Sequence, residues 1–148
     1  MNLEQLLANL DADLQREVTH WHFYKHSSMV ITGIHRPELR EFFQKQADEE
    51  SSHIDEFAQL ILGLGGKPST NNLTLNCPHY EDPRLILEHS IKLEQEVVKN
   101  YTKRIQEAEQ LEDVDPVNSR FVVIFLEEQL LHSRQDLDEM TMILKGLK

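Results

Sequence analysis

The sequence contains little cysteine, glycine and proline, and it has no long hydrophobic run. Among its 148 residues there is one cysteine, Cys77, with five glycines and five prolines. A single cysteine excludes an intrachain disulfide, so we expect a reducing compartment and no redox role for Cys77. No apolar stretch approaches the ~18 residues that span a membrane, and the first residues predict an amphipathic helix rather than a signal peptide. These absences predict a cytoplasmic protein with no membrane partner.

Positive charge is also scarce. Lysine and arginine number 15 against 26 aspartate and glutamate residues, which gives a formal net charge of −11. Nucleic-acid binding needs a basic footprint, and neither end of the chain carries a basic tail, so we expect no nucleic-acid partner. An acidic excess suits a protein that attracts cations, although it also serves solubility. The length and the ordinary balance of 39% hydrophobic and 28% charged residues predict one folded domain over residues 1–148.

Helical periodicity dominates the chain. Inward-facing positions recur in steps of three and four from Leu3 to Ile31, and again from Leu39 to Leu64, where "GLGG" supplies a glycine stop. A third helix is predicted from Pro83 to Ala108, and a fourth over residues 116–146. Residues 63–82 are rich in Gly, Pro, Asn and Ser and carry no period, so this long connection should cross the molecule. The prediction is an all-α four-helix bundle with one long crossover between the second and third helices.

Acidic residues interrupt the rows of apolar, inward-facing positions near the middle of three helices. They are Glu17, Glu50 with His53 one turn later, and Glu94. The midpoints of four aligned helices meet in the bundle core, where three carboxylates would repel one another strongly. Bound cations with an imidazole ligand would relieve this repulsion, and proton sharing is the alternative. We favour a metal site.

The fourth helix is less regular, and its register decides which side chains could join this site. Its apolar arc includes Gln129 and Asp136, with His132 near the edge. Gln129 and His132 are therefore the predicted inward pair. The rival register turns Glu128 inward and would require a distortion such as a π-bulge.

Taken together, these features resemble the ferritin-like di-iron superfamily, and most of all bacterioferritin and Dps-like proteins. That class places one Glu on each of two helices and Glu-x-x-His on each of the other two. The segment "LEQEVVKNY" around Glu94 resembles the third helix of the family, and "LEEQLLH" matches the length of the corresponding run in the fourth. The likeness spans residues ~3–147. It implies a di-iron centre with the following metal ligands: Glu17, Glu50, His53, Glu94, His132 and either Gln129 or Glu128.

Three features depart from the family pattern. Gln129 stands where the family has a carboxylate, which predicts an asymmetric site with the metal near His132 bound more loosely. Ser51 stands where bacterioferritin has its haem-binding methionine, so haem binding by that route is not expected. We expect no counterpart of the short fifth helix of 24-subunit ferritins, which makes a dimer or a dodecameric cage at least as plausible as a shell of twenty-four subunits.

The resemblance implies iron oxidation and storage in the cytoplasm, with a ferroxidase that passes electrons from Fe²⁺ to O₂ or peroxide. Two alternatives stay open at this point. One is a di-iron oxidase or peroxidase that acts on a small molecule through an apolar channel. The other is a structural member of the family whose metal site has degenerated.

Several further polar residues have two interpretations. The resemblance places Tyr24 beside the metal, and Tyr24 and Tyr101 could each bond a ligand carboxylate or simply pack in the core. Asp136 could orient the His132 ring or lie on the helix surface. His20 is expected at the boundary of the core. The remaining candidates are expected on the surface or in loops: His22, His26, His35, His79, His89, Glu49, Glu56 and Glu139.

Overall fold

The computed structural model describes residues 1–69 and 76–147. Within these residues the regular structure consists of four helices and no strand. The helices are α1 (Leu3–Val30), α2 (Arg36–Gly63), α3 (Pro83–Glu109) and α4 (Pro116–Gly146). The predicted all-α fold is confirmed. A search of the described residues finds no helix that could span a membrane.

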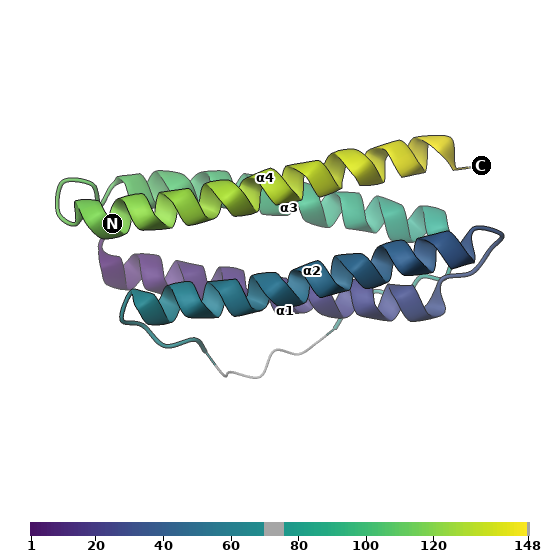
Figure 1. The fold of residues 1–148 in the computed structure, drawn as a ribbon, viewed down its shortest axis with the longest axis horizontal. Helices are drawn as coiled ribbons and strands as arrows, with labels where there is room; N and C mark the ends of the chain where they lie inside the picture. Colours follow the sequence, from purple (N-terminus) through teal and green to yellow (C-terminus); the bar gives the residue numbers. More distant parts are fainter. Residues whose placement is uncertain (70–75, 148) are drawn as a thin grey trace.

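The helices form two antiparallel hairpins, α1 with α2 and α3 with α4, which lie against each other (Figure 1). α2 ends at the opposite end of the bundle from the start of α3, so the connection between them spans the molecule (Figure 1). This is the predicted crossover, and it makes α2 and α3 run in the same direction. Residues 70–75 of the predicted crossover lie outside the described residues.

Local sequence signals determine where the helices begin and end. The Asp82 carboxylate accepts a hydrogen bond of 2.9 Å from the backbone N–H of Arg84, and Asp115 caps α4 in a similar way. A proline follows each of these caps in the first turn, where its missing N–H costs nothing. After α2 the chain turns at Gly65, whose φ of +87° favours glycine. The starts of α3 and α4 and the end of α2 are therefore determined by residues at those positions.

The core consists of two apolar clusters separated by a polar layer. One cluster contains Leu10, Phe57 and Leu126, and the other contains Phe23, Phe43 and Met140. The buried side chains between the clusters are mostly polar: Glu17, His20, Gln46, Glu50, His53, Ser90, Glu94, Gln129 and Ser133. The interruptions that the sequence shows at mid-helix thus come together in one layer.

The buried face of α1 is wider than the single row of inward-facing positions predicted for it. His20 was expected at the edge of the core, but it is buried, with 6% of its surface exposed. Leu6 and Phe23 are also buried, although neither belongs to the predicted row. α1 packs against both α2 and α3, and a helix with two neighbours buries a broader arc than one row.

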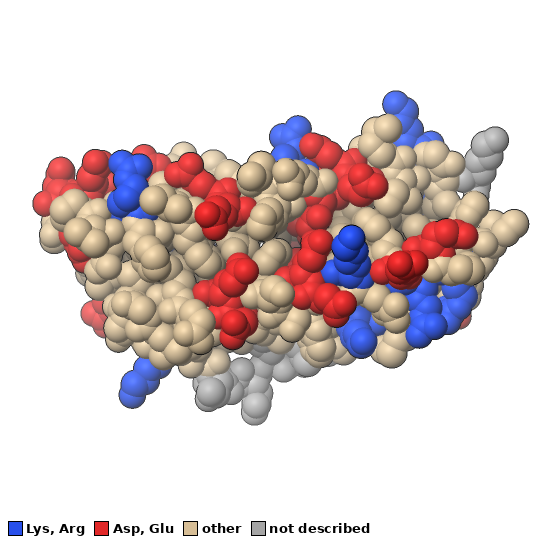
Figure 2. All heavy atoms as spheres, viewed as in Figure 1, with Lys and Arg blue, Asp and Glu red and all other residues tan. Residues whose placement is uncertain are grey.

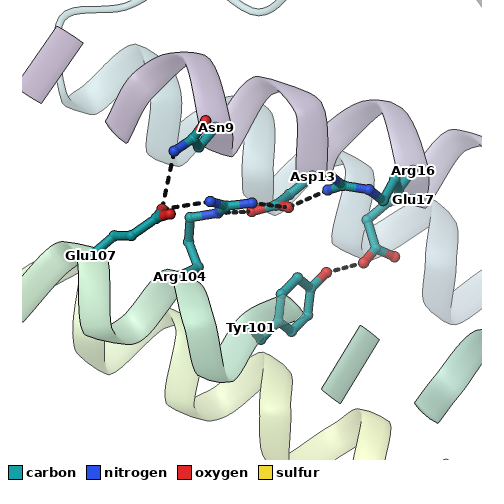
Figure 3. Close-up of polar contacts among 7 residues, drawn as sticks. All are labelled: Asn9, Asp13, Arg16, Glu17, Tyr101, Arg104 and Glu107. Carbon is teal, nitrogen blue, oxygen red and sulfur yellow. Dashed lines mark hydrogen bonds and ion pairs between the residues drawn. The ribbon is translucent and has the colours of Figure 1, made fainter. Parts of the chain in front are cut away.

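A buried ion pair connects α1 to α3 one turn away from Glu17 (Figure 3). The Arg104 guanidinium donates to both carboxylate oxygens of Asp13, at 2.8 and 3.1 Å. It also donates to Glu107 at 2.5 Å, and Glu107 accepts from Asn9 at 3.1 Å. Burial raises the pKa of the Asp13 carboxyl, and the bonds to Arg104 oppose that rise. Such a paired charge holds two helices in register.

Replacing Arg104 with methionine should lower the free energy of unfolding by about 2 kcal/mol, because buried Asp13 would keep only the partly exposed Arg16, at 2.5 Å, as its partner. Urea denaturation followed by circular dichroism measures the loss. The control is Arg134→Met, which removes an exposed pair with Asp138 (3.0 Å) and should cost less than about 1 kcal/mol. Equal losses in the two variants would contradict a stabilising role for the buried pair.

Candidate metal centre

The polar layer holds three metal-ligating side chains whose donor atoms lie close together. Glu17 comes from α1, and Glu50 and His53 come from one face of α2. One ligand atom from each lies within 4.8 Å of the others, and no other group of three in the part of the chain that the structure describes meets this criterion. The Nδ1 atom of His53 is 3.5 Å from Glu50 Oε2 and 3.7 Å from Glu17 Oε2. Three of the predicted ligands thus converge on one point.

The two carboxylates of this group fit a cation. Glu17 and Glu50 are almost fully buried, with 2% and 4% of their surfaces exposed. The Oε2 atom of each is enclosed and has no hydrogen-bond partner. Leaving a buried charged acceptor unsatisfied is costly, and a cation between the two oxygens would satisfy both. Carboxylate oxygens with one imidazole suit iron in either oxidation state, and they also suit zinc.

Without a cation, one proton is held by this pair of carboxylates. Burial and the neighbouring charge of Glu17 raise the pKa of Glu50 well above its usual value. Burial alone would also raise the pKa of Glu17, but the neighbouring Glu50 and His53 and the hydrogen bond from Tyr101 bring it down to about 2. The proton therefore resides on Glu50, and Glu17 is ionised. Burial lowers the pKa of His53, but bonding to Glu17 outweighs this effect and raises it.

Two tyrosines hold two of the predicted ligand carboxylates. The Tyr24 hydroxyl on α1 donates to Oε1 of Glu94 on α3 at 2.7 Å. In return, the Tyr101 hydroxyl on α3 donates to Oε1 of Glu17 on α1 (Figure 3). Burial raises the pKa of Glu94 to about 8, although the bond from Tyr24 acts in the opposite direction. Glu94 is buried in the same layer but lies outside the group of three.

On α4, Gln129 faces the interior and Glu128 is exposed. The Gln129 amide donates through Nε2 to Oε2 of Glu56 at 2.7 Å, whereas its Oε1 atom is buried without a partner. Glu56 was expected on a solvated face. Although it is exposed, it contacts Gln129 because it follows His53 by three residues on the side of α2 that faces α4.

A cavity of about 260 Å³ opens between α2 and α4 next to His53. Its lining is mainly polar and charged: Glu49, Ser52, His53, Glu56, His132, Gln135 and Asp136. The rings of His53 and His132 lie nearly parallel, with centroids 6.2 Å apart. His132 was predicted as a ligand but is exposed at this cavity and is not part of the group of three. Figure 2 shows acidic side chains gathered around the middle of the face formed by α2 and α4.

The same cavity explains the surroundings of Asp136 and Glu49. Glu49 was expected on the solvated surface, but it is half-buried and faces Asp136 across the gap between α2 and α4. Burial and the charge of Glu49 raise the pKa of Asp136 to about 7, while a hydrogen bond with Gln46 opposes the rise. No hydrogen bond between Asp136 and the His132 ring occurs among the described side chains. Asp136 therefore lines the cavity without orienting the His132 ring, and it becomes fully ionised only above a pH of about 7.

A family model for the ferritin-like domain matches residues 7–141. The chain belongs to the ferritin-like family. A search of curated proteins found no match.

Solved structures with this fold include ferritin-like diiron-carboxylate proteins and a dodecameric thioferritin. A ferritin-like, diiron-carboxylate protein from Bacillus anthracis is 29% identical, with a TM-score of 0.84 over 97% of this chain and 99% of the other. A DPS protein from Vibrio cholerae is 14% identical, with a TM-score of 0.87 over 96% of this chain and 90% of the other. The dodecameric thioferritin of Bacteroides fragilis, a bacterioferritin-related protein, is 19% identical, with a TM-score of 0.69 over 100% of this chain and 94% of the other. The last two likenesses concern the fold alone.

Metal binding should release protons. Below a pH of about 8, Glu94 carries a proton in the metal-free chain, and the Glu17–Glu50 pair holds another. A cation that binds these carboxylates must displace protons, so the affinity for redox-inert Zn²⁺ should rise as the pH is raised from about 6 to about 8. Calorimetry in two buffers of different ionisation enthalpy counts the protons, and Glu94→Gln should release fewer. A pH-independent affinity without proton release would contradict this assignment of the protons.

Proposed function

We propose that this chain oxidises Fe²⁺ at the centre formed by Glu17, Glu50 and His53, and that it stores the ferric product inside a homo-oligomeric cage in the cytoplasm. The observation that carries the proposal is the pair of buried carboxylate oxygens without partners, facing one imidazole. Family membership and the di-iron relative from Bacillus anthracis support iron as the cation.

Iron is the substrate in this proposal. Glu17, Glu50 and His53 bind one Fe²⁺, and the proton on Glu50 leaves as the ion arrives. The charge of Glu94 acts on Glu50 across the polar layer, so Glu94 would extend the site, with Tyr24 fixing one of its oxygens. A second Fe²⁺ would bind between Glu94 and His132. The two Fe²⁺ ions give up one electron each. O₂ takes up the two electrons with two protons to form hydrogen peroxide, or peroxide takes them up with two protons to form water.

The composition of the cavity favours this function over oxidation of an organic substrate. A di-iron oxidase needs an apolar channel to its metals, whereas the cavity beside His53 is lined by Glu49, Glu56 and Asp136. Carboxylates along a path concentrate cations and exclude apolar molecules. The net charge of −11 also attracts cations toward the molecule as a whole.

Glu56 supplies the carboxylate that α4 lacks. Gln129 cannot contribute a negative charge, but its Nε2 atom holds Glu56 at 2.7 Å and keeps that carboxylate beside the cavity. The unpartnered Oε1 of Gln129 offers a neutral ligand atom. We infer an asymmetric pair of iron sites, with a tight site at Glu17, Glu50 and His53 and a weaker site toward α4.

Aerobic addition of Fe²⁺ to the metal-free protein tests the proposal. We expect ferric absorbance to develop faster than in buffer, and iron to co-sediment with a large protein particle. Glu50→Gln should slow the initial rate by at least about tenfold, because it removes one of the two carboxylate ligands of the group. The exposed Glu139→Gln is the matched control and should keep the wild-type rate. Oxidation no faster than in buffer would refute the ferroxidase, and oxidation without a large particle would refute storage.

Changing the charge at position 129 tests the asymmetry. Gln129→Glu should tighten the weaker site, because it places a carboxylate in the interior opposite Glu56. Anaerobic titration of Fe²⁺ counts the ions bound per chain and gives both affinities. Glu56→Gln should act in the opposite direction and weaken the same site. If neither variant changes the titration, then the metal does not use this side of α4.

A further inference from the structure

Three histidines gather outside the bundle interior, where α1 meets the last part of the crossover. His22 and His26 lie one turn apart on α1, and their ring centroids are 6.3 Å apart. His79 comes from the crossover, and its Nδ1 atom is 2.8 Å from Nε2 of His26. The iron reaction proposed above uses none of these residues.

The surroundings of His79 indicate which of its nitrogens carries the proton. At 2.8 Å one of the two facing nitrogens must be a donor. The other nitrogen of His79, Nε2, lies 3.6 Å from the Glu81 carboxylate, which favours a proton on Nε2. Nδ1 of His79 then has a free lone pair, and His26 donates to it. A carboxylate behind an imidazole is also the arrangement that orients histidines bound to metals.

We propose that His26 and His79 bind a divalent transition-metal cation, Cu²⁺ or Zn²⁺, in place of the proton between them, and that His22 becomes the third ligand by turning its ring toward the ion. No nitrogen of His22 lies within 4.8 Å of both of the facing nitrogens, so the site forms by this rotation. Two histidines four residues apart on one helical face form a recurrent half of such sites, and a third ligand from another segment completes them. Imidazole is a preferred ligand of both ions. His79 has 55% of its side chain exposed, so water can reach the ion and fill its remaining coordination.

The cation would fasten the crossover to α1. The end of the crossover is already bonded to the residues that follow α1. The Glu81 carbonyl accepts a hydrogen bond of 2.9 Å from the Thr32 backbone N–H and one of 3.0 Å from the Thr32 hydroxyl. His79 lies two residues before Glu81, so a metal bond from His79 to α1 would add a second attachment. This would hold residues 76–82 against the helix that carries Glu17.

Cu²⁺ binding to the metal-free full chain tests the site. Electron paramagnetic resonance counts the coordinated imidazole nitrogens, and it separates this site from the buried centre, where the group of three contains one histidine. We expect a bound Cu²⁺ with at least two nitrogen ligands. His79→Gln should remove one Cu²⁺ per chain, and Glu81→Gln should weaken its binding by about tenfold. His35→Gln, which alters an exposed histidine beside Glu38, should leave binding unchanged.

A second measurement keeps the proposal testable if a variant folds poorly. Adding Zn²⁺ to the wild-type chain should slow amide hydrogen exchange in residues 76–82. Equal Cu²⁺ spectra and stoichiometry for wild type and His79→Gln, or unchanged exchange with Zn²⁺, would overturn the site and leave a metal-free histidine contact. Fe²⁺ oxidation should be the same in His79→Gln and in wild type. A negative result at the histidine site would therefore leave the proposed iron reaction untouched.

Discussion

The mutual repulsion of carboxylates in a buried layer is the constraint on which the rest of this structure depends. Glu17, Glu50 and Glu94 lie between two apolar clusters, where charges are poorly screened. The metal-free chain reduces the repulsion with protons and phenol hydroxyls: Glu50 holds a proton beside ionised Glu17, and Tyr24 bonds Glu94. These are the protons that a cation bound by the carboxylates would have to displace.

The fold and part of the site could be predicted from the sequence, because both depend on the periodicity of individual helices. The spacing of Leu, Phe and Ile gives each helix its inward face, and the acids within that face must meet at mid-bundle. The start of α3 after Asp82 and the span of α4 also follow from local signals. These features need no knowledge of which helix lies opposite.

The remaining features depend on which helices are neighbours, and periodicity does not determine that. Asp13 is buried beside Arg104 because α1 packs on α3 as well as on α2. Glu56 has a polar partner because the opposite helix presents an amide at Gln129. His132 is exposed at the cavity between α2 and α4, so its place near the edge of the apolar arc corresponds to the surface rather than to the interior.

The polar layer draws its side chains from both hairpins. Glu17, Glu50 and His53 belong to the α1–α2 hairpin, whereas Glu94, Gln129 and Ser133 belong to α3–α4. The Tyr24–Glu94 and Tyr101–Glu17 bonds join the two halves. A cation bound by Glu17, Glu50 and His53 that also takes Glu94 as a ligand would connect the two hairpins, and unfolding would have to release the ion before the hairpins could separate. Iron loading would then lengthen the lifetime of the folded subunit, so that the cargo protects its own container against thermal and proteolytic loss.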